Sequence, residues 1–399
     1  MTASLVLYDD ARARQFEPFA LTRPAGELRA GAELIRRRWE RAAGARATGF
    51  AGAPHLAAFE EFDAPPSVHG TLAAGTIVTN SRFAIALDAA LGDAHAWTCD
   101  GRVAAVRLSL PLDSSQLADG TFDLESVATG AAAGIRGWWM EEVWDLVGKL
   151  SDMMGADIAA LASGTEDPPS HVAVLGGHGA YVERGAYFEP YVLIDTTEGP
   201  VLVRRGARVA AFTRLVGPCV IGEDVQVAGG KIKNCSIGEH SRVHGELSGT
   251  IFLGHANKAH DGFVGNSVVG RWVNLGAGTI TSNLKNSYGK VSLWTPGGTR
   301  RTGETFLGSF IGDHAKLGIG TRLTTGCVVG AGANVFGTAM PPKYVPPFAW
   351  GDVPPFKEFD AVKFLEIAAR VMERRGVTLG ENGRRTLSAA WAKRGDFRT

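Results

Sequence analysis

The sequence predicts an α/β unit, then an all-β left-handed parallel β-helix, then a short helical tail. The β-helix is predicted by aliphatic residues that recur every six positions between Val203 and Val335. A period of six fits neither a single helix nor a half-buried strand, but it fits coils with three flat faces, each with one inward side chain. Two unbroken series are Val203, Val209, Leu215, Ile221 and Val227, and Ile311, Leu317, Leu323, Val329 and Val335.

Glycines in the same region support this fold. Several of the aliphatic residues are followed at once by glycine, as in Ile221-Gly222 and Leu275-Gly276. A small residue permits a tight corner, often with positive φ. Each coil then takes about eighteen residues and cannot bury its inner face alone, so the coils must stack to form a common core.

The α/β unit is predicted by short apolar strands that alternate with helical patterns. Such alternation favours a Rossmann-like parallel sheet with helices on both of its faces. Arg36 and Arg38 are expected on the solvated side of the first helix. The expected strands are 5–8, 76–79 and 103–108, and the expected helices are 27–41, 83–91 and 143–154.

Composition predicts where the units meet. The run GTEDPP at 164–169 is typical of a linker. The expected domains are therefore an α/β domain at 1–165, a β-helix at 166–350 and a helical tail at 351–399.

Two further features mark the second half of the chain. Residues 283–305 interrupt the repeats, and a loop of this length projecting from a solenoid is a frequent place for a site. Three proline pairs between 341 and 355 are expected to end the sheet, since proline cannot donate to a ladder. Helices are expected at 362–372 and 385–393.

The balance of charge excludes two classes of partner. Lys plus Arg and Asp plus Glu both number 41, so the net charge is zero and neither nucleic acid nor an acidic membrane is an expected partner. The four cysteines lie far apart without a CxxC pair, which is typical of a reduced setting. There is no N-terminal signal pattern and no apolar run of membrane-spanning length. We therefore expect a cytoplasmic protein.

His260, in the run NKAHD, is the first candidate for chemistry. A neutral imidazole can take a proton from an amine near pH 7. Taken alone, a histidine on a solenoid is more often an ordinary surface residue. About one coil later come Asn274 and then Asn283, at the start of the insertion, and side chains about eighteen residues apart stack on one face. We therefore expect these three side chains to converge.

These residues also carry a resemblance. NLGAGTITSN after a histidine-bearing coil resembles the acetyltransferase half of the bifunctional bacterial enzyme family that makes UDP-N-acetylglucosamine. Three segments of the chain are more similar to a divergent branch of that family than to the better-known enzymes. The branch is identified as sugar nucleotidyltransferases with a hexapeptide-repeat left-handed β-helix. These segments are LTRPAGELRAGAELIRRRWE, NKAHDGFVGNSVVGRWVNLGAGTITSNLKNSYGKV and PPKYVPPFAWGD. The resemblance spans residues 5–352 and is most specific at 255–291.

For the β-helix, the resemblance implies acetyl-CoA-dependent N-acetyltransfer to an amino-sugar 1-phosphate. His260 falls on the histidine that deprotonates the amine, and Asn274 and Asn283 fall on asparagines that contact the sugar or orient that histidine. Residues that fall near the acetyl-CoA positions are Gly318, Ile319 and Gly337. The family is trimeric, with sites between adjacent prisms, so a homotrimer is expected.

The chain departs from the family at the substrate phosphate. Phe263 and Leu284 stand where the family has tyrosines, and Ser248 and Gly249 stand where it has a lysine. The residues expected to supply positive charge instead are Lys258, Lys285, Arg300 and Arg301.

For the first unit, the resemblance implies that a sugar 1-phosphate attacks the α-phosphate of a nucleoside triphosphate, UTP being the first choice, while Mg²⁺ offsets charge. The usual Gly-rich turn is missing, because residues 9–16 are DDARARQF. Arg23 and Arg29 are candidates to hold the phosphates. With equal weight, these arginines pair with Glu27 and neighbouring acids.

The metal ligands of this unit stay unassigned. Asn80-Ser81-Arg82 stands where a metal-binding aspartate is expected. Weak candidates are Asp9, Asp10 and Asp100.

Three functions are open at this point. The first is a bifunctional enzyme of nucleotide-sugar biosynthesis, with nucleotidyl transfer in the first unit and acetyl transfer on the β-helix. The second is nucleotidyl transfer alone, with the β-helix as a trimer scaffold. The third is a non-catalytic nucleotide-sugar-binding protein. A zinc-dependent hydratase built on histidines such as His255 and His260 is disfavoured by the fused first domain and the NLGAGT run.

Overall fold

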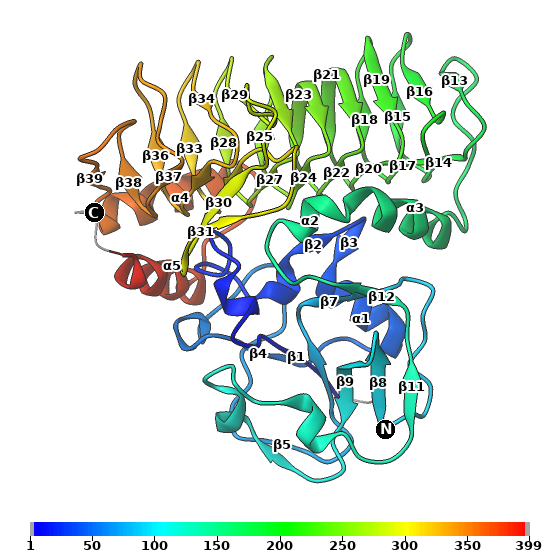
Figure 1. The fold of residues 1–399 in the computed structure, drawn as a ribbon. Coiled ribbons are helices and arrows are strands. Elements are labelled where there is room, and N and C mark those ends of the chain that lie inside the picture. The colour runs from blue at the N-terminus through cyan, green and yellow to red at the C-terminus, as the bar shows by residue number, and fades with distance from the viewer. Residues whose placement is uncertain (1–3, 396–399) are drawn as a thin grey trace. The chain divides into compact units, whose positions relative to one another are not determined.

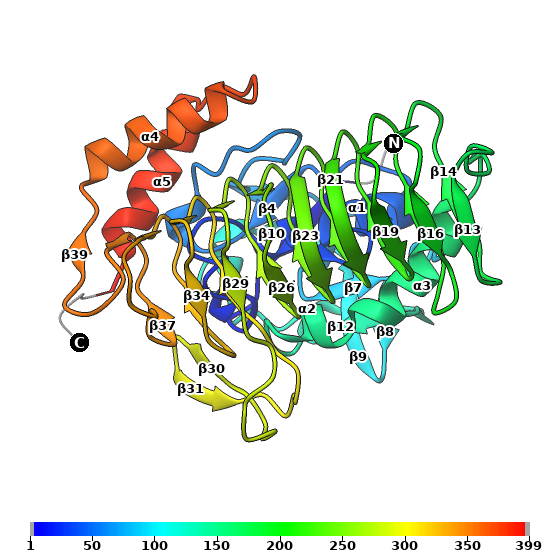
Figure 2. The same cartoon turned by 90° about the horizontal axis from the view of Figure 1, so that it is seen from above.

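The computed structural model describes residues 4–395 of the chain. These residues form two compact units, shown in Figures 1 and 2. Residues 4–143 with 378–393 make one, called here the N-terminal unit, and residues 144–377 with 394–395 make the other, the solenoid unit. Within the described residues, no helix is both long and apolar enough to cross a membrane.

The N-terminal unit is built on a six-stranded sheet. Its strands are β1 (Leu5–Tyr8), β4 (Gly49–Ala51), β6 (Ile77–Asn80), β8 (Ala96–Cys99), β9 (Arg102–Arg107) and β11 (Ala132–Gly134). The spatial order is β11-β8-β9-β6-β1-β4. The strands expected at 5–8, 76–79 and 103–108 are confirmed.

The expectation of a wholly parallel sheet is wrong. β1 is parallel to β4 and β6, but β9 is antiparallel to β6 and to β8. A two-residue turn joins β8 to β9, and both turn residues have positive φ, 53° at Asp100 and 74° at Gly101. Asp-Gly is a strong signal for such a hairpin, because both positions require left-handed backbone.

Helices are fewer than expected in this unit. Within residues 4–143 the one α-helix is α1 (Ile35–Ala43), so the expected start at Glu27 is wrong. The helix expected at 83–91 is also wrong, because β7 (Phe83–Ile85) pairs there with β12 (Gly137–Trp139). All three β7 residues are buried, and a short continuous apolar run suits a strand covered on both sides. Minor strands are β2 (Arg29–Ala30), β3 (Glu33–Leu34), β5 (Thr71–Leu72) and β10 (Leu112–Asp113).

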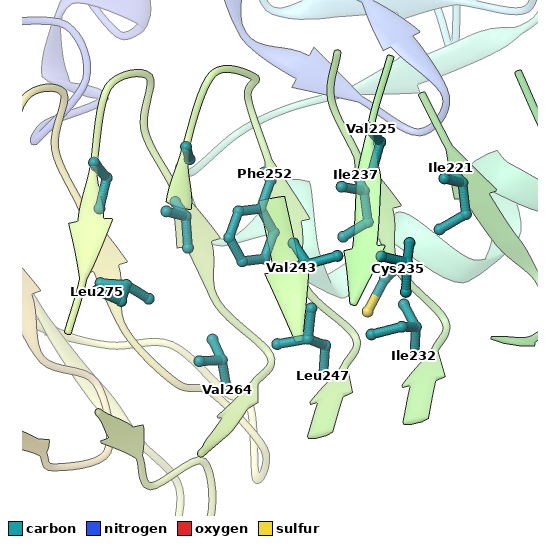
Figure 3. Close-up of a cluster of buried hydrophobic side chains, with 14 of the residues drawn as sticks. Ile221, Val225, Ile232, Cys235, Ile237, Val243, Leu247, Phe252, Val264 and Leu275 are labelled. Carbon is teal, nitrogen blue, oxygen red and sulfur yellow. The ribbon is translucent and has the colours of Figure 1, made fainter. Parts of the chain in front are cut away.

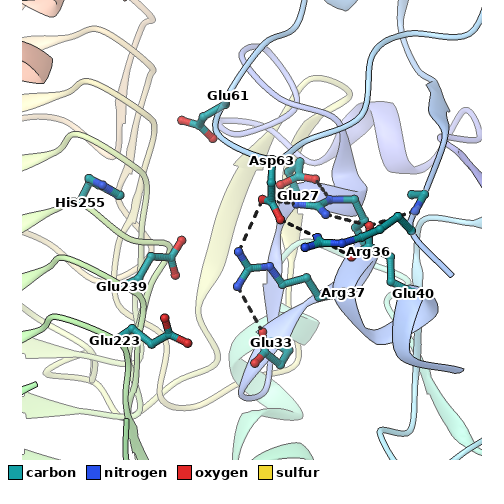
Figure 4. A network of polar contacts seen from close by, with 12 residues as sticks. Glu27, Glu33, Arg36, Arg37, Glu40, Glu61, Asp63, Glu223, Glu239 and His255 are labelled. Atoms are coloured by element: carbon teal, nitrogen blue, oxygen red, sulfur yellow. Dashed lines mark hydrogen bonds and ion pairs between the residues drawn. The ribbon is translucent and has the colours of Figure 1, made fainter. Parts of the chain in front are cut away.

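Arg36 and Arg38 are buried, so the expectation that they are solvated is wrong. The guanidinium of Arg36 donates to Glu27 at 2.5 Å, to Glu40 at 2.9 Å and to Asp63 at 3.0 Å, as Figure 4 shows. Three carboxylates thus surround one guanidinium, the arrangement that makes a buried charge tolerable. Arg38 donates instead to the carbonyl oxygens of Ala30 and Ile85. The first turns of α1 are therefore tied to the loop before it.

The solenoid unit begins with two helices, α2 (Asp145–Gly148) and α3 (Leu150–Leu161), where one helix was expected at 143–154. Parallel strands then stack into coils with three faces, and pairing along the chain defines each face. The first face comprises β15 (Tyr187–Phe188), β18 (Arg208–Val209), the start of β21 (Gln226–Lys233), the start of β23 (Arg242–Ser248), β25 (Asn257–Lys258), β28 (Asn274–Leu275), β33 (Lys316–Leu317), β36 (Asn334–Val335) and β38 (Ala349–Trp350).

The other two faces are built in the same way. The second face comprises β13 (Ala173–Leu175), β16 (Leu193–Asp195), β19 (Thr213–Val216), the ends of β21 and β23, β26 (Phe263–Gly265), β29 (Ile280–Thr281) and β34 (Arg322–Leu323). The third face comprises β14 (Ala180–Val182), β17 (Val201–Val203), β20 (Cys219–Ile221), β22 (Ser236–Ile237), β24 (Ile251–Phe252), β27 (Val268–Val269), β32 (Phe310–Ile311), β35 (Val328–Val329) and β37 (Tyr344–Val345).

The core of the solenoid is a column of aliphatic side chains, one from each face of each coil (Figure 3). Val243, Leu247 and Phe252 represent the three faces of one coil, and all are fully buried. Each such side chain contributes about 1.5–3 kcal/mol when it leaves water. The period of six is therefore confirmed as the signature of this core.

The corners between the third and first faces hold non-glycine residues in left-handed backbone. His240, His255, Trp272 and His314 have φ values between 52° and 61°. Their rings contact one another from coil to coil, with centroids 4.7 Å, 4.5 Å and 6.3 Å apart. These ring contacts offset the cost of this backbone conformation in residues other than glycine.

The insertion expected at 283–305 is confirmed as a projecting element. It forms an antiparallel hairpin of β30 (Ser292–Thr295) and β31 (Gly298–Arg301). Trp294 stacks on Tyr344 of the solenoid at 3.7 Å between ring centroids, which fixes the hairpin to the third face.

The expectation that the proline pairs end the sheet is wrong. β37 pairs with β35 and β38 with β36, so the coils continue to Trp350. β37 is the last strand of its face, and the carbonyl oxygen of Val345 accepts a hydrogen bond from the N–H of Gly330. Among residues 4–395 no further strand follows on this face, so the missing N–H groups of Pro346 and Pro347 leave no acceptor unpaired on that side. Then follow β39 (Lys357–Glu358), α4 (Ala361–Glu373) and, in the N-terminal unit, α5 (Glu381–Lys393). The two helices expected at 362–372 and 385–393 are confirmed.

Leu323→Ala should lower the free energy of unfolding by about 2–5 kcal/mol, since Leu323 is an inward residue of β34 and the change leaves a cavity in the column. Its neighbour Arg322 points outward, so Arg322→Ala is the matched control, with an expected loss below about 0.5 kcal/mol. Urea unfolding of both variants measures the difference. Equal losses would contradict the inward–outward assignment of β34.

Candidate functional site

His260 lies on an exposed corner between the first and second faces, in the segment 259–262 that joins β25 to β26. Gly262 has φ 135°, and a Cβ there would collide with the carbonyl oxygen of Thr279 on the next coil. The corner is thus held tightly against the coil that follows. Within residues 4–395, neither Asn274 nor Asn283 forms a hydrogen bond with the His260 side chain.

Lys258 supports this corner from the interior. It occupies the inward position of β25, in register with Val243, and is fully buried. Its ammonium donates to the carbonyl oxygens of His260 and of Asp261, the latter at 2.9 Å. Burial lowers the pKa of Lys258 to about 8, although the nearby carboxylate of Asp261 acts in the opposite direction. Lys258 was expected to supply positive charge near a substrate phosphate. In the structure its ammonium instead contacts the backbone that carries His260.

The sequence contained a signal for this inward lysine. Phe252, Lys258 and Val264 are spaced by six, and both flanking residues belong to the core. A lysine in phase with core positions indicates a buried charge that must find partners.

Successive corners continue this edge of the solenoid, called here the His260 edge. It comprises residues 259–262, 276–279 and 318–321. The corners are joined by hydrogen bonds, from Gly278 N to Asp261 O at 3.1 Å and from Gly320 N to Ala277 O at 2.7 Å. Gly318 and Ile319 thus lie on the same edge as His260, and the Ile319 side chain is 80% exposed. Gly337 follows β36 one coil further on.

The two asparagines take different positions. Asn274 lies on the first face and accepts from Asn257 at 2.7 Å. Asn283 lies beyond β29, at the corner between the second and third faces, and donates to Asn266 at 2.7 Å. Neither asparagine contacts His260 directly, so the structure does not show the expected convergence, although all three residues lie in neighbouring coils.

Phe263 connects the His260 edge to Asn283 across the second face. Gly265 follows it in β26, and the space a side chain would take there is filled by the Phe263 ring and by the amide of Asn283, which would lie 2.8 Å from an added Cβ. An apolar ring and an amide donor therefore lie side by side. They present one flat apolar surface and one hydrogen-bonding group.

A second histidine, His244, lies beside the corner that carries His260, and the sequence alone did not predict this proximity. His244 Nδ1 is 3.2 Å from the carboxylate of Asp261, whose side chain is 90% exposed. Within residues 4–395, no three His, Cys, Asp or Glu side chains converge to hold a metal ion. His255 and His240 belong to the stacked corner described above.

The remaining cations of the solenoid site lie on the insertion. Lys285 donates its ammonium to the carbonyl oxygen of Lys290 within the same loop. Arg300 and Arg301 are exposed on β31, and Arg300 lies over the ring of Trp144 at 5.7 Å. They provide positive charge on the projecting hairpin.

In the N-terminal unit, Arg23 and Arg29 are both buried and bound to other parts of the unit. Arg23 donates to both carboxylate oxygens of Glu61, at 2.7 Å and 3.3 Å. Arg29 donates to the carbonyl oxygen of Ala32 at 2.5 Å. Arg23 therefore pairs with an acid, Glu61, whereas the contact described for Arg29 is with a backbone carbonyl.

The acids after β1 have opposite environments. Burial raises the pKa of Asp9 to about 6. For Asp10, burial would also raise the pKa, but hydrogen bonds from Arg82 and Asn80 outweigh it and hold the pKa below its usual range. Arg82 contacts Asp10 at 2.7 Å. Asp9 thus takes up a proton at higher pH than an ordinary aspartate, whereas the charge of Asp10 is balanced by the guanidinium of Arg82.

The hollow of the N-terminal unit measures about 380 Å³ and begins where β4 ends. Gly52, Ala53 and Pro54 form one wall, and residues 113–115 form another. Ligands of open α/β sheets bind outside the carboxyl ends of parallel strands. Arg14 stabilises the region by donating to four carbonyl oxygens, those of Asp9, Gly52, Leu117 and Ala118.

The chain thus combines an α/β unit that has a cavity at the ends of its parallel strands with a parallel β-solenoid. Residues 5–166 match the family described as sugar nucleotidyl transferase. This match and the solenoid confirm the predicted fold class and the resemblance to the bifunctional family.

Curated relatives are similar over shorter stretches. The "Bifunctional sugar-1-phosphate nucleotidylyltransferase/acetyltransferase" of Sulfurisphaera tokodaii is 32% identical over 95 residues, which is 24% of this chain and 24% of the relative. The "Bifunctional protein GlmU" of Thermotoga petrophila is 27% identical over 179 residues, 39% of this chain and 35% of the relative. The "Bifunctional protein GlmU" of Methanococcus vannielii is 33% identical over 90 residues, 23% and 22% of the two chains. The chain therefore spans about a quarter to a third of the length of these relatives.

Lys258→Met should change how stability depends on pH. The folded-state pKa of Lys258 is about 8, below the ordinary 10.5, so the unfolded chain binds more protons between these values. Wild-type stability relative to the variant should therefore rise between about pH 8 and pH 10, by roughly 2–3 kcal/mol. Denaturant unfolding across this range measures it. Lys231→Met, at an exposed lysine of β21, is the control, and a flat difference for Lys258→Met would contradict the buried position.

Proposed function

We propose that the chain is a bifunctional enzyme of nucleotide-sugar biosynthesis. The solenoid would transfer an acetyl group from acetyl-CoA to the amine of an amino-sugar 1-phosphate. The N-terminal unit would transfer a nucleotidyl group from a nucleoside triphosphate, UTP as first choice, to a sugar 1-phosphate. The observation that carries the proposal is His260 on a corner fixed from below by Lys258 and continued by Gly318 and Ile319. The names of the relatives supply the two reaction types.

In the acetyl-transfer step, the amine nitrogen attacks the thioester carbonyl and His260 takes the proton that the nitrogen loses. The carbonyl oxygen becomes an oxyanion, which backbone N–H groups of the corner would stabilise. Collapse forms the amide and expels the thiolate of CoA, which recovers a proton from the imidazolium. Because Lys258 holds the carbonyls of the corner, His260 does not need to be positioned by a second side chain.

The substrates would be arranged on both sides of His260. Acetyl-CoA would lie along the His260 edge past Gly318, Ile319 and Gly337, where exposed backbone lets a long chain approach. The sugar would lie over Phe263, near Asn283. Its phosphate would meet the cations of the insertion, Lys285 among them.

A single solenoid edge covers a ligand on one side only. We propose a homotrimer in which a neighbouring prism covers the other side, as closed cyclic assemblies allow. All four cysteines are free, which agrees with the proposed cytoplasmic setting.

For nucleotidyl transfer, the triphosphate would enter the cavity at the end of β4 as its Mg²⁺ complex. The side chains after β1 do not fit a resident Mg²⁺, because Asp10 is bound by Arg82 and Asn80, and Asp9 is 3% exposed. No step is therefore assigned to a metal held by the chain. The same Asp10–Arg82 pair supports a second candidate function for this unit, binding of a nucleotide sugar without turnover.

His260→Ala should lower the rate of acetyl transfer about 10²–10⁴-fold, the usual loss when a general base is removed. Thiol release from acetyl-CoA in the presence of glucosamine 1-phosphate measures the rate. His178→Ala, at an exposed histidine of an earlier coil, is the control and should leave the rate unchanged. Acetyl transfer that survives His260→Ala would overturn the assignment of the base.

Gly52→Val should raise the KM for the nucleoside triphosphate about tenfold, the effect of one or two misplaced methyl groups in a pocket. The backbone tolerates the change, because an added Cβ would meet only Asp9 Oδ2, at 3.7 Å, and the methyl groups then enter the cavity. Pyrophosphate release from UTP and a sugar 1-phosphate measures it, with Gly134→Val as control. If the unaltered protein releases no pyrophosphate from any nucleoside triphosphate yet binds a nucleotide sugar, the second candidate function holds instead.

A further inference from the structure

The first face of the solenoid carries a basic hollow that the proposed reactions do not use. A cavity of about 290 Å³ lies between this face and the end of α4. Arg242 and Lys316 contribute from the face, and Arg374 and Arg375 contribute from the helix end. No aspartate or glutamate is among the residues that line it.

These cations differ from several other arginines of the solenoid. Elsewhere an arginine on one coil pairs with a carboxylate on a neighbouring coil, as Arg204 does with Glu183 at 2.7 Å and Arg271 with Glu239 at 2.7 Å. Within residues 4–395, Arg242, Arg374 and Arg375 form no ion pair. An uncompensated group of positive charges in a partly enclosed space raises the local concentration of anions.

The groups of the hollow repel each other in the absence of an anion. Arg375 donates to the carbonyl oxygen of His240 at 2.9 Å. Burial lowers the pKa of Arg375, and the charges of Arg242 and Arg374 lower it further. Lys316 donates to the carbonyl oxygen of Trp272, and burial lowers its pKa to about 7. An anion would relieve both the repulsion and the cost of burial.

The helix alone explains part of this cluster. Arginines at a helix C-terminus interact favourably with its dipole, which accounts for Arg374 and Arg375. It does not account for Arg242 and Lys316, which lie on strands of the opposite wall.

The shape of the hollow indicates the size of the ligand. A second cavity, of about 390 Å³, shares Arg242, Arg374 and Arg375 and extends to Arg208 and to Asp224, an acid next to His240. In the other direction, outward residues form a ladder from Arg242 through Asn257 and Asn274 to Lys316. Three steps of about 4.8 Å separate its ends. The space therefore exceeds a single phosphate and offers amides beside the cations.

We propose that this hollow binds the diphosphate group of an organic diphosphate. The guanidinium groups of Arg242 and Arg375 would contact the phosphate oxygens, for which their fork geometry is suited. The uncharged part of the ligand would lie toward Asn257, Asn274 and the edge of Trp272. The inference stands apart from acetyl transfer, because it concerns the first face and not the His260 edge, and it is tested by binding.

The test is calorimetric titration of the full chain with pyrophosphate, UDP, CoA and orthophosphate. We expect pyrophosphate and at least one organic diphosphate to bind, and Arg242→Ala and Arg375→Ala each to weaken that binding at least tenfold. Arg322→Ala, at an exposed arginine of the second face, should bind as the unaltered chain does. Arg242 is exposed on its strand, so its variant should keep the thermal unfolding temperature.

The outcomes separate the sources and the alternatives. Only the binding that Arg242→Ala removes reports on this hollow, because UTP and acetyl-CoA have proposed sites elsewhere. A larger loss for UDP than for CoA would identify a nucleotide as the ligand, the reverse would identify CoA, and either supports the proposal. No binding of any probe, or binding that both variants leave intact, overturns it. A change of oligomeric state in Arg242→Ala without any diphosphate binding also overturns it, because an acidic surface of a second copy would then fill the hollow. Since His260→Ala should keep the binding, failure of acetyl transfer and failure of this site are distinguishable.

Discussion

The structure of the solenoid depends on one constraint, that no coil can bury its own inner side chains. One aliphatic residue per face is covered only when coils stack, and stacking requires hydrogen bonds from each coil to the next. Equivalent positions of successive coils therefore lie about 4.8 Å apart in straight rows. Residues far apart in sequence, such as His260 and Gly318, are brought onto one edge by the regularity of the core alone.

Lys258 shows how the core and the site are linked. An aliphatic residue at this inward position would stabilise the column, whereas a lysine costs desolvation that only good partners offset. Its partners are carbonyls of the corner that presents His260. The same corner is closed from the other side by Gly262, which packs against the next coil. The desolvation cost of Lys258 is thus offset by contacts that fix the backbone carrying His260.

The sequence predicted what packing alone decides and missed what depends on local backbone or on distant partners. The period of six follows directly from burial, which is why the solenoid was predictable. The β8–β9 hairpin does not follow from strand–helix alternation. Its signal in the sequence is the Asp100-Gly101 turn, where both residues have positive φ. The burial of Arg36 was missed because its acceptors include Asp63, whose proximity no helical period reveals.

The same distinction applies to the site. The resemblance assigns roles to His260, Gly318 and Ile319, and the rows of the solenoid bring these residues onto one edge. Asn274 and Asn283 are nine residues apart, about half of a 17-residue coil, and therefore lie on different sides of the prism. Stacking of residues one coil apart does not bring both to His260.

This geometry gives a solenoid two distinct kinds of binding surface. An edge presents backbone at every coil, so it suits a long flexible ligand and a base held at one point. A face presents a row of outward side chains, so it can gather charge from Arg242 to Lys316 without disturbing the core. On the first face these charges have no carboxylate partners, although neighbouring coils elsewhere supply them readily. Repulsion among these neighbouring cations disfavours the empty state, and a bound anion is the simplest way to remove that cost.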